Sequence, residues 1–510
     1  MPTADADTAT CSLIVLRPDD NVAVAARPLP QHSAQVIEGS TLVMKSPIPL
    51  GHKVAIRAIA AKEPVRKYGQ IIGFASQPIA AGEHVHTHNV KADLFERDYA
   101  FASERPPVPK PERPRTFQGF LRPDGRVGTR NLIAVISTVN CSASTSRLVS
   151  ERFRDGAWKR DFPNVDGVFA ITHKGGCGLP YGGIDHEQLE RVLAGFANHP
   201  NVAAYVVIGL GCEVSFAQHL IETQDLLLRN SPARDRDQAR RPRMLNIQDE
   251  GGITRTVEAA QDAVLKLMPE ANACARTEQP ASRIVLALEC GGSDGNSGIT
   301  ANPALGVASD LLIAQGGTAI LGETTEIYGA EHLLTRRAVS PEVGQKLVDR
   351  IHWWEWYTGL FGAEINNNPS PGNKAGGLTT IYEKSLGALA KGGSTPLVDV
   401  VRYAERVDTP GLVFMDTPGY DPPCTTGLVA SGANVLVFTT GRGSVLGLQP
   451  TPCIKVATNT PMYDRMIDDM DLNAGTVLEG ESLESAGRRL FELILEVASG
   501  APTKSERQGV

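Results

Sequence analysis

Hydrophobic and polar positions divide the chain into three parts, and the first part is built from short apolar runs. Residues 12–90 contain the runs SLIVLRP, VAVAARPL, HKVAIRAI and IIGFASQPI, separated by Asp, Gly and Pro, and show no helical period of useful length. Short apolar runs bounded by turn residues are typical of β-strands. The pattern predicts a small all-β module, which we place at residues 1–92.

Between residues 119 and 280, short apolar runs alternate with segments of helical period. This alternation predicts a mainly parallel sheet with helices on its faces. The expected strands are Asn131–Thr138, Gly167–Thr172, Ala203–Leu210 and Arg243–Ile247. The expected helices are Ser144–Phe153, Glu187–Ala197 and Phe216–Leu228.

The alternation restarts at residue 281 and continues to residue 510. Ile284–Leu288 predicts a buried strand that opens into the polar, glycine-rich loop Gly291–Gly298. Further expected elements are the helices Leu305–Gln315, Ser340–Trp356 and Ser482–Ala498 and the strands Thr318–Leu321, Gly411–Met415 and Asn434–Phe438. Ligands of open parallel sheets bind outside the carboxyl ends of the strands, so we expect the functional site there.

The predicted fold class is therefore α/β, with a small N-terminal all-β module followed by two α/β domains with mainly parallel sheets, at residues 119–280 and 281–510. Residues 93–118 separate the module from these domains and contain the Pro-rich run Arg105–Pro114, which predicts a stiff, extended linker. At about 3.1 Å per residue, its roughly 26 residues could span about 80 Å. The module could thus reach over its own crevice or that of a partner subunit.

Composition narrows the class of protein. A chain of 510 residues is too long for one ordinary core, and its net charge of −7 argues against nucleic acid as the main partner. A run of about 18 apolar residues does not occur, so we expect no membrane span. The N-terminus lacks the pattern of a signal peptide, and the eight cysteines are widely scattered. We therefore expect a cytoplasmic protein.

Four cysteines occupy equivalent local positions. Cys141, Cys177, Cys212 and Cys290 each lie just past the end of an expected strand, beside Gly or a polar residue. If the strands are parallel, these loops open on one edge of a sheet, and thiolates there favour iron or zinc. The alternative is a set of buried structural thiols, since free cysteine is a common small core residue. We expect the four thiols to converge on a metal ion or an iron–sulfur cluster.

Other candidate residues are cationic or can titrate. His84, His86 and His88 would line one face of an extended segment and bind a metal or a carboxylate, or form a polar edge strand. His173, in the loop of Cys177, is a candidate general base, although a hydrogen-bonded structural histidine is the simpler interpretation. Lys374 and Arg442 lie in glycine-rich loops and could bind a carboxylate or phosphate, or be solvated. The candidate substrate-binding residues also include Ser293, Asp294 and Asn373, and Glu326 is a further candidate metal ligand.

Several long motifs, in a fixed order, resemble the altronate dehydratase and galactarate dehydratase family over nearly the whole chain. They are GFLRPDGRVGTRN (Gly119–Asn131), IGLGCE (Ile208–Glu213), ECGGSDGNSGITANP (Glu289–Pro303), NPSPGNKAGG (Asn368–Gly377) and TTGRG (Thr439–Gly443). The first unit resembles the small SAF module, a β-clip fold, of this family. The text GEHVHTHN (Gly82–Asn89), the NPSPGNKAGG loop and Arg402–Arg406 resemble the altronate branch more than the galactarate branch.

The resemblance implies an iron-dependent sugar-acid dehydratase of hexuronate or hexarate catabolism. The iron would be Fe²⁺ or an iron–sulfur cluster, with Mn²⁺ as a possible substitute, and His84, His86 and Glu326 could hold a mononuclear ion in place of the thiols. The expected partners are a small sugar acid and further copies of the chain, as a homodimer or a higher homo-oligomer.

The expected reaction is the loss of water from D-altronate to give 2-dehydro-3-deoxy-D-gluconate. A base abstracts the C2 proton, cations stabilise the resulting aci-carboxylate, and the metal assists loss of the C3 hydroxyl. Three alternatives stay open: a galactarate dehydratase, a related sulfo-lyase, and a non-catalytic sugar-acid-binding protein. We also expect the N-terminal module to complete the site and help to select the substrate, because a lid excludes water from a carbanion.

Overall fold

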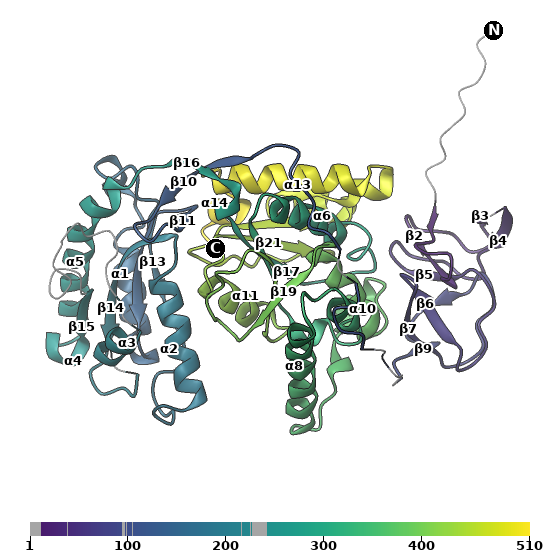
Figure 1. Cartoon of the computed structure of the whole chain (residues 1–510), viewed down its shortest axis with the longest axis horizontal. Helices are drawn as coiled ribbons and strands as arrows, with labels where there is room; N and C mark the ends of the chain where they lie inside the picture. The colour runs from purple at the N-terminus through teal and green to yellow at the C-terminus, as the bar shows by residue number, and fades with distance from the viewer. Residues whose placement is uncertain are drawn as a thin grey trace, which may run out of the picture.

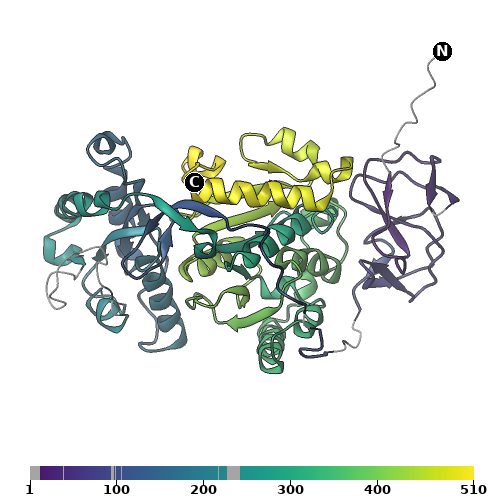
Figure 2. The ribbon, with the colours of Figure 1, turned by 45° about the horizontal axis from the view of Figure 1, so that its top comes forward.

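The computed structural model describes residues 12–37, 39–93, 97, 99–104, 106–215, 217–224, 226 and 242–510. The C-terminal domain lies in the middle of the molecule, with the N-terminal module on one side and the second domain on the other (Figures 1 and 2). The confirmed fold class is an antiparallel β module followed by parallel-sheet α/β domains. Within the described ranges, no helix combines the length and apolar character needed to cross a membrane.

The N-terminal module consists of three small antiparallel sheets, in the orders β1-β2-β5-β8, β6-β7-β9 and β3-β4. Their bounds are β1 Leu13–Ile14, β2 Val22–Ala25, β3 Ala34–Ile37, β4 Ser40–Val43, β5 Lys53–Ala55, β6 Pro64–Lys67, β7 Gln70–Ala75, β8 His84–Val85 and β9 Val90–Lys91. One side of the module packs on its own core around Met44 and Val54. Its other side, including Val65 and Ile72, joins the core of the C-terminal domain. The module is thus docked on the C-terminal domain by apolar packing.

The second domain contains a four-stranded parallel sheet in the order β13-β12-β14-β15. The strands are β12 Leu132–Ser137, β13 Gly167–Ile171, β14 Val202–Gly209 and β15 Arg243–Asn246. The helices are η1 Asn140–Ser142, α1 Ala143–Glu151, η2 Ala157–Arg160, α2 Ile184–Ala197, α3 Ala217–Thr223, α4 Ile247–Glu250 and α5 Ile253–Ala273. Every residue of β12 and β14 is buried, because helices cover both faces of the sheet. Part of the helix expected at Phe216–Leu228 lies outside the described residues.

The C-terminal domain contains a seven-stranded parallel sheet in the order β19-β20-β18-β17-β21-β22-β23. The strands are β17 Val285–Cys290, β18 Thr318–Leu321, β19 Leu397–Val401, β20 Gly411–Met415, β21 Val435–Thr440, β22 Cys453–Ala457 and β23 Leu472–Asn473. The helices are η3 Ala281–Arg283, α6 Ala301–Ala314, η4 Thr324–Glu326, α7 His332–Arg336, α8 Pro341–Gly359, η5 Ile365–Asn367, α9 Pro371–Ala375, α10 Ile381–Leu389, η6 Ala390–Gly392, α11 Asp421–Ala430, α12 Thr460–Arg465, η7 Gly475–Glu479, α13 Leu483–Ala498 and α14 Lys504–Gln508. The chain starts the sheet at β17 and adds strands on both sides of it. A topological switch point of this kind leaves a crevice outside the carboxyl ends of the strands.

A small three-stranded sheet joins the two α/β domains. It has the order β11-β10-β16, formed by β10 Thr116–Leu121, β11 Val127–Gly128 and β16 Thr277–Pro280. The chain enters the second domain through β10 and leaves it through β16, and these two strands pair antiparallel, from Thr116 opposite Pro280 to Gly119 opposite Thr277. The second domain is therefore attached through two adjacent strands.

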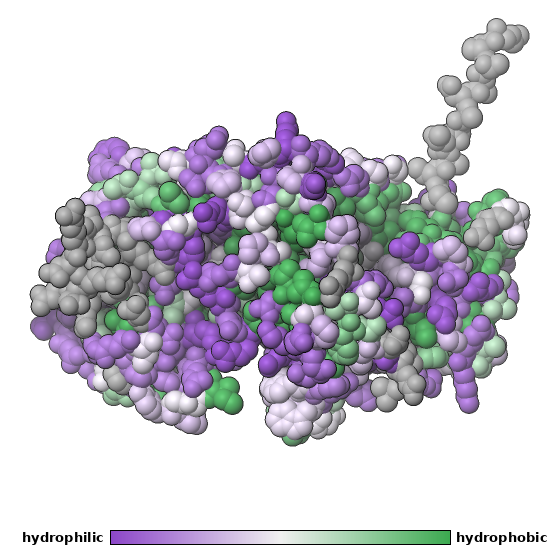
Figure 3. All heavy atoms as spheres, viewed as in Figure 1, coloured by the Kyte–Doolittle hydropathy of each residue, from purple (hydrophilic) through white to green (hydrophobic). Residues whose placement is uncertain are grey.

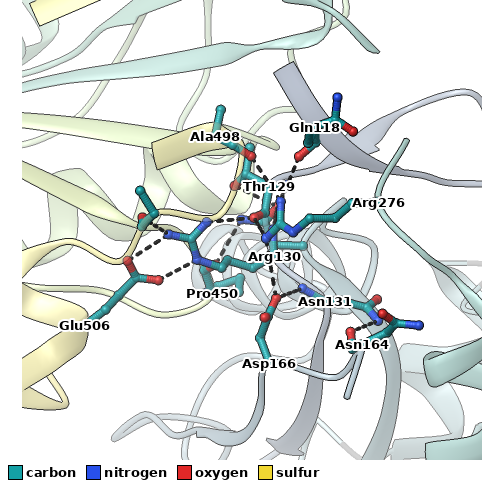
Figure 4. Close-up of polar contacts among 12 residues, drawn as sticks. Gln118, Thr129, Arg130, Asn131, Asn164, Asp166, Arg276, Pro450, Ala498 and Glu506 are labelled. Carbon is teal, nitrogen blue, oxygen red and sulfur yellow. Dashed lines mark hydrogen bonds and ion pairs between the residues drawn. The ribbon is translucent and has the colours of Figure 1, made fainter. Parts of the chain in front are cut away.

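The sequence GTRN at residues 128–131 fixes this junction (Figure 4). The Arg130 guanidinium donates to Glu506 of α14 at 2.6 and 2.8 Å and to the Val497 carbonyl at 2.9 Å. The Thr129 hydroxyl donates to the Asn434 carbonyl at 2.6 Å. Arg130 and Thr129 are both buried. This motif, which is part of the family resemblance, therefore joins the domains.

Candidate active site

Two neighbouring parallel strands of the C-terminal domain end in side chains that meet. Strand β17 ends at Cys290, and β18 leads into Glu323 and then Glu326 of η4. The Cys290 sulfur lies 3.6 and 3.7 Å from the two carboxyl oxygens of Glu323 and 4.0 Å from Oε2 of Glu326. One ligand atom from each of the three residues lies within 4.8 Å of the others. Cys290 and Glu326, both expected as metal ligands, are thus brought together.

Two buried lysines compensate the charge of these carboxylates. Lys391 of η6 donates to the Cys290 sulfur at 2.8 Å and pairs with Glu323, while Lys384 of α10 pairs with Glu326. Each of these side chains is at most 5% exposed. A buried ion pair is tolerated only when its charges are compensated in this way. We refer to Cys290, Glu323, Glu326, Lys384 and Lys391 as the charge cluster.

Burial shifts the titration of the charge cluster and its neighbours. It raises the pKa of Glu323 to about 8, against the attraction of Lys391, and it raises the pKa of the Cys290 thiol. For Lys391, burial acts to lower the pKa, but attraction to Cys290 and the nearby carboxyl groups outweighs burial and raises it. Burial, reinforced by Glu326, raises the pKa of Asp421 to about 6. Groups with pKa values moved toward neutrality are typical of acid–base sites.

The N-terminal module covers the glycine-rich loop Gly291–Gly298, which lies beside the charge cluster. Lys53 and Lys67 of the module donate to the two oxygens of Glu383 at 2.8 and 3.0 Å, and all three side chains are buried. The two ammonium groups overcome the effect of burial and lower the pKa of Glu383 to about 2. At Gly295, a Cβ would lie 1.9 Å from the Gly51 carbonyl oxygen. The backbone of the glycine-rich loop therefore packs closely against the backbone of the module.

Four histidines of the module gather over the loop that carries Lys374. His84 Nε2 lies 3.0 Å from Nδ1 of His52, and His86 Nε2 lies 2.8 Å from the Lys374 carbonyl oxygen. The ring of His88 lies 5.6 Å from that of His84. Burial is the main cause that lowers the pKa of His52 to about 4 and of His84 to about 3, so these rings are neutral at neutral pH. The expected gathering of His84, His86 and His88 is observed, and His52 joins them.

Two of the expected substrate-binding side chains hold loops together. The Asp294 carboxylate accepts hydrogen bonds from Ser297, Thr458 and Asn459. Asn373 forms a capping box with Ser370 at the start of α9, and its amide donates to the Ser293 carbonyl at 2.8 Å. The Ser293 hydroxyl is buried without a hydrogen-bond partner. Asp294 and Asn373 therefore position the loops of this site through bonds within the protein.

Lys374 and Arg442 lie on adjacent loops. Lys374 is half-buried and Arg442 is exposed. A Cβ on Gly376 would lie 3.1 Å from Cδ of Arg442, so the Arg442 side chain passes directly over the loop of Lys374. Two cations that are open to solvent and close together suit a carboxylate ligand.

The second domain holds the remaining expected residues. Cys141, Cys177 and Cys212 are exposed, whereas Cys290 is buried in another sheet. The four thiols therefore do not converge, because strands of two separate sheets carry them. His173 Nε2 lies 3.0 Å from the Ser137 carbonyl oxygen, and its Nδ1 accepts from the Gly175 amide at 3.2 Å. Both ring nitrogens of His173 thus contact the backbone, which favours the simpler structural interpretation.

The donor set of the charge cluster fits a divalent metal ion. A thiol and two carboxylates converge, and mixed sulfur and oxygen ligands suit first-row transition metals. Lys384 and Lys391 use the same oxygen lone pairs, so pairing with the lysines and binding of an ion are alternatives at Glu326 and Glu323. The sequence analysis did not identify Lys384 and Lys391 as site residues. Two cations seven residues apart in a largely apolar helical segment lie on one face of the helix, and this spacing could have indicated them.

Family models match three consecutive parts of the chain. Residues 11–93 match the altronate/galactarate dehydratase SAF domain, residues 119–272 the second domain of D-galactarate dehydratase/altronate hydrolase, and residues 281–510 the D-galactarate/altronate dehydratase C-terminal domain. The chain belongs to the altronate and galactarate dehydratase family. By its full-length similarity to altronate dehydratases, this chain is a hydro-lyase of the altronate dehydratase type, a sugar-acid dehydratase.

Full-length relatives support the same assignment. The altronate dehydratases of Bacillus subtilis and Escherichia coli are 37% and 36% identical to this chain, over 97% and 96% of it and over 97% and 95% of their own length. The galactarate dehydratase (L-threo-forming) of Escherichia coli is 37% identical, over 89% of this chain and 86% of its own. Overall identity to these dehydratases therefore does not distinguish the altronate from the galactarate branch.

Proposed function

We propose that this dehydratase converts D-altronate to 2-dehydro-3-deoxy-D-gluconate, with D-galactarate as the second candidate substrate. The observation that carries the proposal is the charge cluster, which lies at the carboxyl ends of β17 and β18 beside the docked module. Support for altronate as the substrate comes from the histidine-rich sequence Gly82–Asn89 of the module, where His84 and His86 gather above Lys374. Galactarate stays a candidate because a galactarate dehydratase is as similar overall as the altronate dehydratases.

The reaction begins with loss of a proton from C2, which is a weak acid. Positive charge on the substrate carboxylate stabilises the aci-carboxylate, and preorganised charge of this kind is the largest contribution in many enzymes. Lys374 and Arg442 supply two cations on adjacent loops for this role. The half-buried histidines of the module would contact the hydroxyl groups and keep water away from the carbanion.

Asp421 is the proposed base in place of His173. With a pKa of about 6, its carboxylate is ionised at neutral pH and close to the ideal range for a general base. The C2 proton passes to Asp421, the electron pair forms the C2–C3 double bond, and the C3–oxygen bond breaks. The Lys384 ammonium, whose pKa is raised by its carboxylate neighbours against the effect of burial, gives the departing hydroxide a proton and so releases water. The resulting enol becomes the 2-keto acid when C3 takes up a proton and the C2 hydroxyl loses one.

Iron, as Fe²⁺ or in a cluster, or Mn²⁺ is the proposed metal. Cys290, Glu323 and Glu326 would hold a mononuclear ion. When bound, such an ion supplies a Lewis acid for a substrate oxygen. We further propose that the protein is cytoplasmic and forms a homodimer or a higher homo-oligomer.

The decisive test is formation of a 2-keto acid by anaerobically purified protein supplied with Fe²⁺. We expect faster turnover of D-altronate than of D-galactarate, and no sulfite from sulfolactate. Binding of both sugar acids without turnover would overturn the enzymatic proposal, and faster turnover of galactarate would favour the second candidate.

The role of the module is tested with His86→Asn, with the exposed His32→Asn as a matched control. The first change should lower turnover and alter the ratio of altronate to galactarate activity. If the rate and the ratio both stay those of wild type, the module is structural and altronate loses its main local support.

A further inference from the structure

We infer that the second domain carries a separate binding site for a divalent transition-metal ion, with Zn²⁺ and Fe²⁺ as the two candidates, formed by His186, Glu190 and His219. His186 and Glu190 lie one turn apart on α2, and His219 lies on α3. The Glu190 Oε1 atom lies 3.7 Å from His186 Nε2 and 3.3 Å from His219 Nε2. One ligand atom from each of the three residues lies within 4.8 Å of the others.

Two of these ligand atoms are buried without a hydrogen-bond partner. His186 is 1% exposed and Glu190 is 5% exposed, and neither His186 Nε2 nor Glu190 Oε1 has a hydrogen-bond partner, although Glu190 Oε1 lies 3.3 Å from His219 Nε2. Burying an unsatisfied polar atom is costly, and a binding site for an ion is one of the few explanations for such an atom in a folded protein. The two atoms face each other at 3.7 Å, too far for a normal hydrogen bond. An ion between them would satisfy both.

The surroundings of the three side chains suit metal ligation. The Tyr181 hydroxyl lies 3.1 Å from Nδ1 and 3.4 Å from Nε2 of His219, so a further polar group stands beside the proposed ligand atom. The Gly182 amide lies 3.4 Å from Nδ1 of His186, a long contact that a small rotation of the ring would break. The Tyr181 side of the cluster is exposed, which gives an ion a path to the site.

The donor types define the class of ion. Two imidazoles and one carboxylate bind Zn²⁺, and the same set with open positions binds Fe²⁺. The hard, all-oxygen ligand set that Ca²⁺ and Mg²⁺ require is not present in this group. The site is also distinct from the charge cluster, which lies at the end of another sheet and contains a thiol and no imidazole.

A bound ion would tie together three segments of the second domain. These are the loop of Cys177 and Tyr181, the first turns of α2, and α3, which follows Cys212. Helix α2 also contacts the C-terminal domain, where Arg191 donates to the Tyr403 carbonyl at 2.9 Å. The ion would therefore brace the edge of the second domain that carries two of the three exposed thiols. This inference does not depend on the proposed dehydratase reaction.

The test is metal analysis and Zn²⁺ or Fe²⁺ titration of the full-length protein, for wild type, His219→Gln and Glu190→Gln. The exposed His352→Gln serves as the matched control. We expect both cluster variants to lose one equivalent of metal and to weaken binding by at least on the order of 100-fold, the upper end of the loss caused by a missing outer partner. His352→Gln should bind like wild type. Elemental analysis of the bound fraction distinguishes zinc from iron.

A Co²⁺ titration of wild-type protein protects the test against a variant that fails to fold. Co²⁺ at this site should give visible ligand-field bands that persist when thiols are blocked, because no thiolate takes part. Equal metal content and affinity in wild type and folded variants, or the absence of thiol-independent Co²⁺ bands, would overturn the inference. The three residues would then be two histidines packed around a glutamate without an ion.

Discussion

The two parallel sheets of this protein end in very different edges. At the carboxyl edge of the seven-stranded sheet, Cys290 is buried among carboxylates and lysines. At the same edge of the four-stranded sheet, Cys141, Cys177 and Cys212 are exposed. The local sequence position is the same in all four cases, namely just past a strand. The difference comes from what covers the edge, because α10, η6 and the loops beneath the docked module close over the first, and the second lies open.

The surface reflects the same contrast. In Figure 3 the outline of the molecule is notched between the second domain and the region of α8, with hydrophilic side chains at the top of the notch and hydrophobic or pale ones along its lower sides. A closed edge excludes water and shifts pKa values strongly, as at Glu323 and Asp421. This contrast supports the proposed placement of the chemistry in the C-terminal domain.

The largest effect is expected from the charge cluster. Glu323→Gln keeps the size of the side chain but removes its charge, leaving Lys391 buried without its carboxylate, and we expect kcat to fall by about 10²–10⁴-fold, as for loss of a catalytic acid–base or electrostatic group. Glu258→Gln, on the exposed side of α5 in the second domain, is the control and should keep the wild-type rate. Similar rates for both variants in a 2-keto acid assay would contradict the assignment.

The next effect concerns the cover of the closed edge. Glu383→Gln leaves Lys53 and Lys67 buried without a counter-charge, and removing one member of a buried ion pair costs about 3–5 kcal/mol. We expect residues 12–93 to exchange amide hydrogens faster and the linker to become sensitive to protease. The control is Asp93→Asn, whose pair with Lys91 is exposed and contributes less than about 1 kcal/mol. Unchanged exchange in Glu383→Gln would show that apolar packing alone docks the module.

Acid should release the same contact. The pKa of Glu383 is lowered to about 2 in the folded protein, so its ionisation stabilises the docked state above the normal glutamate range, and this stabilisation is lost as the pH falls from about 4.5 toward 2. Amide exchange of the module measured down this range should show undocking before the second domain unfolds. If the module undocks and the second domain unfolds at the same pH, the ionisation of Glu383 does not control docking.

A moderate effect is expected on the pH profile. The base must be ionised, so the rate should rise about tenfold per pH unit below the Asp421 pKa of about 6 and level off above it. Asp421→Asn should lower the rate and remove this rise of the rate with pH. If the residual rate of Asp421→Asn still rises with pH in this range, the base is another group.

The smallest change in metal content is expected for substitutions of the exposed cysteines of the second domain. Cys290→Ser removes one ligand of the charge cluster and should lower the content of iron, whereas Cys141→Ser, Cys177→Ser and Cys212→Ser should leave that iron in place. Iron and acid-labile sulfide are measured on anaerobically purified protein. Loss of iron or sulfide in the second-domain variants would indicate an iron–sulfur cluster at the exposed thiols. It would contradict the contrast drawn between the two sheet edges.

The sequence allowed the fold and one half of the site to be predicted, because both depend on local patterns. Buried strands such as β12 and β14 are continuous apolar runs, and residues just past β17 and β18 must meet when these strands are parallel neighbours. Cys290 and Glu326 followed from that rule.

The other half depends on contacts that no local pattern records. Lys53 meets Glu383 across 330 positions, and His52 joins His84 only after the module has folded. The convergence of four thiols failed for a related reason, since a strand end does not reveal which sheet its strand will join. The charges of Lys384 and Lys391 resemble those of surface cations until the packing of α10 and η6 buries them.

The docking of the first module on residues near the end of the chain also sets an order of events during synthesis. At about 5–20 residues per second, the 330 positions between Lys53 and Glu383 take roughly 16 to 66 seconds to translate. During that interval Lys53 and Lys67 have no carboxylate partner, and the apolar face around Val65 and Ile72 has no core to join. The nascent module must wait with this face uncovered, and it is therefore the segment of the chain that a ribosome-associated chaperone would meet first.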